Sequence, residues 1–132
     1  MESAIVSSLV RRHMKGMDAF VFAAPAVDVP VRVELVEGES LIGWYQNPPP
    51  WERCFVLFGT RSMYLSEDAG IARVVMDDIV DYELPKSKKN VPGVKVVTCS
   101  GSFFVRMAGV HGKDGEFSDA FRLVMFFHAL LL

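Results

Sequence analysis

The chain has 132 residues, of which 51% are hydrophobic and 23% charged, and its formal net charge is −2 at pH 7. This length suffices for one domain with its own core, and the weakly negative charge excludes a general attraction to nucleic acid or to anionic membranes. The mean hydropathy of +0.26 is high for a soluble monomer of this size. We therefore expect apolar surface to be covered in a homo-oligomer or by a protein partner.

The N-terminal segment predicts an amphipathic helix, with Ser3 as its N-cap and Gly16 near its end. Polar and basic residues occupy one side, and apolar residues recur at helical spacing on the other: Ile5, Val6, Leu9, Val10, Met14 and Met17. The basic side is typical of a solvated face on a packed helix. The alternative is a helix that lies on a membrane surface.

Residues 23–30 predict a linker, because Pro25 and Pro30 exclude regular structure there. The apolar run 19–24 is too short for a signal peptide and begins directly after Asp18. No stretch approaches the length of a membrane span. We expect a cytoplasmic protein in which residues 1–30 form the N-terminal helix and linker, and residues 31–132 form the main domain.

The main domain begins with short β-rich runs separated by turn residues. The alternating run 31–36 predicts either a short strand or an extended lead-in. The run 54–58 is continuously apolar, which predicts a strand covered on both faces. Its core-facing residues are expected to be Phe55 and Leu57, or else Val56 and Phe58. Further strands are predicted over 41–45, 63–65, 71–76, 79–84, 94–100 and 103–108.

The last segment predicts a helix from Asp119 to about Leu131, with Ser118 as its cap. Apolar residues cover most of its circumference, so a sheet alone cannot bury them. We expect three of them to face the core: Phe121, Val124 and Met125. A second strip would face water in a monomer and favours a homodimer or larger homo-oligomer; it comprises Phe126, Phe127, Leu130 and Leu131.

Four features of this pattern occur in a familiar order: Gly38-Glu39 before the first strand, the hairpin VLFGTRSMYL, the segment DDIVDYE before the next strand, and the closing helix. From about Val36 to Leu131 the chain resembles the pleckstrin-homology-like (PH-like) superfamily, in particular GRAM and bacterial PH domains. The resemblance implies a mainly β (α+β) fold, an open barrel of about seven antiparallel strands capped by the C-terminal helix. The N-terminal helix lies outside it.

The resemblance also implies a non-catalytic binding module without a cofactor, and bacterial PH domains tend to oligomerise. Some PH-like domains bind phosphoinositides through basic residues of the first hairpin loop. Here that loop is residues 46–52 and is rich in proline; Trp44, Tyr45 and Trp51 bracket it, and Arg53 lies just beyond it. These aromatic residues could contact a ligand, or they could simply pack the loop onto the barrel.

A second candidate site is the loop after residue 84, which contains lysines and no acid. Its basic residues could hold an anionic lipid or phosphate headgroup, or the loop could be a solvated connection. The lysines are Lys86, Lys88, Lys89 and, at the start of the next strand, Lys95.

An enzymatic alternative rests on His111, Asp114 and Glu116, which share one loop and could act as metal ligands or as an acid–base pair. Such loop residues face solvent by default, and we expect neither catalysis nor a metal. Cys54 and Cys99 lie far apart within apolar strand patterns. We expect two buried free thiols, with a disulfide or a reactive thiol as the alternatives.

Overall fold

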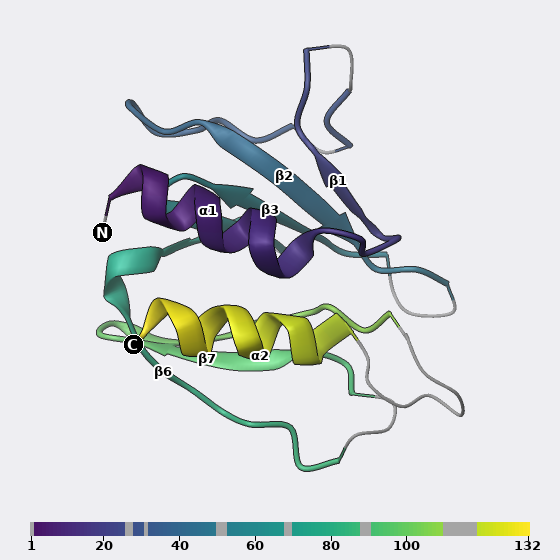
Figure 1. The fold of residues 1–132 in the computed structure, drawn as a ribbon, viewed down its shortest axis with the longest axis vertical. Coiled ribbons are helices and arrows are strands. Elements are labelled where there is room, and N and C mark those ends of the chain that lie inside the picture. Colours follow the sequence, from purple (N-terminus) through teal and green to yellow (C-terminus); the bar gives the residue numbers. More distant parts are fainter. Residues whose placement is uncertain are drawn as a thin grey trace.

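The computed structural model describes residues 2–25, 28–30, 32–49, 53–67, 70–87, 91–109 and 119–132. Within these ranges, eight strands form two antiparallel sheets and are accompanied by two helices and one 3₁₀ turn (Figure 1). The prediction of a mainly β, α+β fold is therefore confirmed. No helix in these ranges is long and apolar enough to cross a bilayer.

The first sheet has five strands in the order of the chain. Their bounds are β1 (Phe20–Phe22), β2 (Leu41–Gln46), β3 (Phe55–Gly59), β4 (Ser62–Glu67) and β5 (Gly70–Val75). All five residues of β3 are buried, which confirms that this strand is covered on both faces. Both candidate core pairs of β3 are therefore buried, one pair on each side.

The start of this sheet holds one strand that was not predicted. β1 lies directly before the predicted linker 23–30, in the apolar run 19–24, and pairs with β2 so that Phe20 faces Tyr45; a run of three residues is too short to show an alternating pattern. Residues 32–36 lie outside any strand, which agrees with the lead-in alternative for that segment.

The second sheet has three strands, β6 (Ile79–Tyr82), β7 (Val94–Thr98) and β8 (Gly101–Val105). The 3₁₀ turn η1 (Met76–Asp78) connects it to β5. Cys54 and Cys99 are both free, as expected. Cys54 is buried, but Cys99 is exposed because it lies in the turn just after β7 rather than within a strand.

The helices are α1 (Ser3–Met14) and α2 (Asp119–Leu130), which lie between the two sheets in the view of Figure 1. α1 begins one residue before the prediction: its N-cap is Glu2, and no side chain caps it. The two helices are joined by Arg122, whose guanidinium donates to the carbonyls of His13 (3.2 Å) and Lys15 (3.0 Å). This pairing satisfies carbonyls at the end of α1 that have no partner within the helix.

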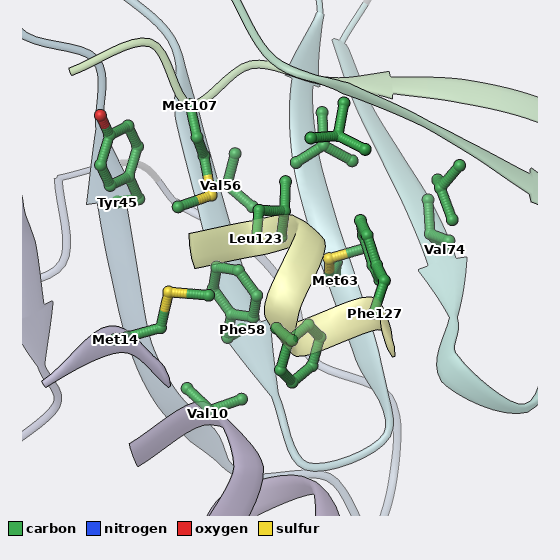
Figure 2. Close-up of a cluster of buried hydrophobic side chains, with 14 of the residues drawn as sticks. Val10, Met14, Tyr45, Val56, Phe58, Met63, Val74, Met107, Leu123 and Phe127 are labelled. Atoms are coloured by element: carbon green, nitrogen blue, oxygen red, sulfur yellow. The ribbon is translucent and has the colours of Figure 1, made fainter. Parts of the chain in front are cut away.

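One hydrophobic core collects residues from both helices and from the inner faces of both sheets. Figure 2 shows part of it, with side chains that include Val10, Met14, Phe58, Met63, Leu123 and Phe127. The N-terminal helix therefore shares its core with the main domain.

The prediction for the faces of α2 is wrong in most positions. Met125 is 59% exposed and Phe121 is half-buried, whereas Phe126 is fully buried. The ring of Phe126 lies 6.5 Å from that of His13 in α1 and 5.8 Å from that of Phe58 in β3. α1 thus covers Phe126 of the strip that we expected to face water, and the Phe127 ring lies 6.1 Å from that of Tyr82 in β6. Of the four residues on which the argument for self-association rested, Phe126, Phe127 and Leu130 are buried and only Leu131 is exposed.

The contact between the helices also predicts a pH dependence. Burial, Arg12 and Arg122 together hold the pKa of His13 below its ordinary value. Below a pH of about 6.5 the unfolded chain binds a proton there more readily than the folded chain does, so the free energy of unfolding is expected to fall as the pH is lowered. Urea titrations at pH 7.5 and 5.5 measure this loss.

The variant His13→Gln should show a smaller loss than the wild type over the same interval. Equal losses in the wild type and in His13→Gln would contradict the assignment.

Candidate binding site

The lysine loop is described in part. Lys88 and Lys89 lie outside the described residues, and Lys86 is exposed. Lys95 forms an ion pair with Glu83, in which Nζ lies 3.7 Å from Oε1. One of the two described lysines is thus already paired with an acid.

The residues around the proline-rich loop are placed differently from one another. Trp44 is buried, which identifies it as a packing residue. Arg53 is exposed, and its guanidinium carbon lies 5.5 Å from the centre of the Phe55 ring. Trp51 lies outside the described residues.

The loop of the enzymatic alternative, with His111, Asp114 and Glu116, also lies outside the described residues. In the part of the chain that the structure describes, no group of three or more His, Cys, Asp or Glu side chains is suited to a metal ion.

The structure shows a second apolar cluster that the sequence did not indicate. It lies on the face of the five-stranded sheet that points away from the helices, which we call the outer face, and consists of Trp44, Phe55, Leu57 and Tyr64. Trp44 faces Leu57 on β3, and Leu57 faces Tyr64 on β4. Since directly opposite residues share one face of a sheet, these three side chains form a row across the outer face.

A segment without regular structure covers this row. Exposed and half-buried residues alternate along it: Arg32, Glu34 and Val36 are exposed, and Val33 and Leu35 are half-buried. Val33 and Leu35 pack against the cluster. The alternation that suggested a strand thus reflects a covering segment with one side on the sheet.

Two polar contacts anchor the end of this covering segment at the turn between β3 and β4. The backbone N–H of Ser40 donates to Oγ1 of Thr60 (3.1 Å), and the N–H of Thr60 donates to the carbonyl of Ser40 (2.9 Å). Both hydrogen bonds join Ser40 to Thr60 in this turn, so they fix where the covering segment meets the sheet.

Glu39 adds a buried carboxylate to this anchor. Its Oε2 accepts from Oγ of Ser62 (3.3 Å) and from Nη2 of Arg73 (3.4 Å). The side chain passes so close to Gly59 that a Cβ there would collide with Oε1. A buried carboxylate needs such partners, so the contact holds the covering segment in one position on the sheet.

Between the covering segment and the sheet lies a groove of about 350 Å³. Its lining is aliphatic except for one arginine: Val29, Arg32, Val33, Leu35, Leu41 and Leu57. The volume falls at the small end of the range for sites that bind small molecules. Leu57 lies in β3 and Leu41 at the start of β2; the other four lining residues, Val29, Arg32, Val33 and Leu35, precede β2.

A smaller hollow of about 240 Å³ lies beside η1 and contains two arginines, Arg61 and Arg73, together with Asp77. Arg73 is paired with Glu39, and Asp77 carries a further negative charge. The charges of Arg61, Arg73, Glu39 and Asp77 sum to zero, so this hollow has no net charge that would select an ion.

A buried polar cluster joins β2 to the start of α2. The hydroxyl of Tyr45 donates to Oδ2 of Asp119 (2.6 Å) and accepts from the backbone N–H of Gly109 (2.8 Å). Burial, followed by the hydrogen bond to Asp119, raises the pKa of Tyr45. The side chain of Tyr45 is inaccessible to solvent, so this cluster is a structural link rather than a site for a ligand.

Beside it, Oδ1 of Asn47 accepts from the N–H of Ala108 (2.9 Å). Tyr45 and Asn47 thus tie the end of β2 to Gly109 and Ala108, which follow β8 in the chain. The outer groove combines accessible volume, a mostly apolar lining and one unpaired charge among the described residues.

Comparison with known proteins adds no further assignment, since the chain matches no family model, no curated protein and no solved structure.

Proposed function

We propose that the protein is a non-catalytic binding domain built on a PH-like open barrel, and that the outer groove is its ligand site. The order of elements supports the PH-like part: four antiparallel strands (β2 to β5), a three-stranded meander (β6 to β8) and a closing helix, α2. α1 and β1 are additions before this order begins.

The groove itself is the observation that carries the binding function. An apolar sheet face that no helix covers would expose Leu57 and its neighbours to water. The covering segment shields the row formed by Trp44, Leu57 and Tyr64 but leaves a groove of about 350 Å³ beside it. Entry of an apolar molecule would remove both its own surface and the aliphatic lining from water, which stabilises the complex by about 25 cal/mol per Å² of apolar surface.

A larger side chain in the lining of the groove is expected to weaken the binding of an apolar ligand. A suitable probe is the neutral fluorophore N-phenyl-1-naphthylamine, whose emission rises when it enters an apolar site. Val33 lines the groove, and Val33→Phe adds a ring to that wall. We expect the affinity for the probe to fall at least about tenfold, which corresponds to about 1.4 kcal/mol.

The matched control is Val36→Phe, because Val36 lies on the same segment but is exposed and does not line the groove. This variant should bind the probe as the wild type does. Equal affinity in Val33→Phe and Val36→Phe would show that the probe binds elsewhere, and no binding to the wild type would reject the groove as a ligand site.

A further inference from the structure

The chemistry of the groove restricts its ligand further. Five of its six lining residues are aliphatic, and none of the six is aromatic. A lining of branched aliphatic side chains holds an apolar ligand by contact area and has no polar side chain, apart from one arginine, that would orient a polar ligand. It is suited to an aliphatic chain.

The exception, Arg32, is available to bind an anion. It is exposed, and among the described residues no acid forms an ion pair with it, although Asp28 and Glu34 are close in sequence. A guanidinium at the edge of an apolar groove can form two parallel hydrogen bonds to a carboxylate, which are stronger than hydrogen bonds between neutral groups.

The covering segment places these two features together. Val33 and Leu35 pack on the sheet while Arg32, the residue before Val33, is exposed beside the same groove. A molecule with an apolar chain and an anionic end could therefore satisfy both at once. Because the groove is of limited size, the chain would be of medium length.

We propose that the outer groove binds a free medium-chain acyl carboxylate, with the aliphatic chain between the covering segment and Leu57 and the carboxylate on the guanidinium of Arg32. This inference rests on the proposed function, because it assigns a ligand class to the same groove. Binding is non-covalent and needs no other reactant.

The test is displacement of N-phenyl-1-naphthylamine by decanoate and by decanol, both kept below the concentration at which they aggregate. In Arg32→Gln, decanoate should bind about tenfold more weakly than in the wild type, the effect of losing one charge-assisted hydrogen-bonded pair. Decanol, which has no charge, should bind both proteins equally. Added salt should weaken decanoate binding to the wild type and have little effect on Arg32→Gln.

Two control variants accompany this test. Arg32→Lys keeps the charge and should retain part of the affinity for decanoate. Arg12→Gln removes an exposed arginine of α1 that does not line the groove and should behave as the wild type. Circular dichroism of each variant confirms that the fold is retained.

The outcomes separate this inference from the proposed function. If Arg32→Gln weakens decanoate and decanol equally or not at all, the assignment of the carboxylate is overturned while the groove stands as a ligand site. If neither compound displaces a probe that Val33→Phe excludes, the acyl carboxylate is overturned while the groove stands as a ligand site. If Val33→Phe and Val36→Phe bind the probe equally, the probe is not in the groove and both proposals fail. Anionic phosphatidylglycerol vesicles test a lipid surface as the source of the same chemistry. If the wild type sediments with these vesicles, Arg32→Gln does not, and decanoate does not displace the probe, then the ligand is a lipid surface and the free carboxylate is overturned.

Discussion

Replacing Phe126 with alanine is expected to lower the free energy of unfolding by about 3–5 kcal/mol, the usual cost of truncating a buried phenylalanine. Its ring is fully buried and packs at 5.8 Å from that of Phe58 and 5.6 Å from that of Phe127. The cavity left by the truncation would lie where α1, α2 and the five-stranded sheet meet. Denaturant titration of both proteins at one pH measures the difference.

The matched control is Met125→Ala on the same helix. Met125 is 59% exposed, so its truncation is expected to change the free energy of unfolding by no more than about 0.5 kcal/mol. A large loss in Met125→Ala together with a small loss in Phe126→Ala would mean that α2 is rotated about its axis, with the face predicted from the sequence turned toward the core.

Removing the hydroxyl of Tyr45 is expected to cost about 2–4 kcal/mol, because Tyr45→Phe deprives two buried groups of a hydrogen-bond partner at once. One is the N–H of Gly109 and the other is the carboxylate of Asp119, which is itself buried. A phenylalanine ring of the same shape leaves the packing intact, so the loss measures the polar link between β2 and α2. Thermal or urea unfolding of the two proteins gives the difference.

Tyr64→Phe provides the contrast for this prediction. The hydroxyl of Tyr64 is also buried, but none of the described residues forms a hydrogen bond with it. Its removal deprives no other group of a partner and is expected to be neutral or slightly stabilising. Equal effects of the two substitutions would argue against the link between Tyr45 and Asp119 as a source of stability.

The sequence by itself determined those features that depend on neighbours along the chain. The unbroken apolar run of 54–58 predicted a strand covered on both faces, and the structure buries every residue of β3. The spacing of Val6, Val10 and Met14 predicted that these residues share one face of a helix, and all three are in the core. The helix follows from its period, and the strand follows from the shortness of the apolar run, because periodicity alone does not separate a buried strand from a buried helix.

The orientation of α2 could not be determined in this way. Apolar residues occupy most of its circumference, so no single face is marked for burial. The choice between Met125 and Phe126 is made by α1, which packs along the helix and brings His13 against the Phe126 ring. A contact between residues more than 100 positions apart leaves no periodic signal in either helix.

The groove was also decided by the tertiary structure alone. Sequence reasoning assigned Trp44 to a loop-end cluster and considered 31–36 only as a strand or a lead-in. The register of β2, β3 and β4 places Trp44 in one row with Leu57 and Tyr64, and the anchor at Glu39 lays the covering segment over that row. Arg32 borders the groove because of this anchor. The spacing of residues in the sequence does not show which sheet face a non-regular segment will cover, since that depends on pairing between distant strands.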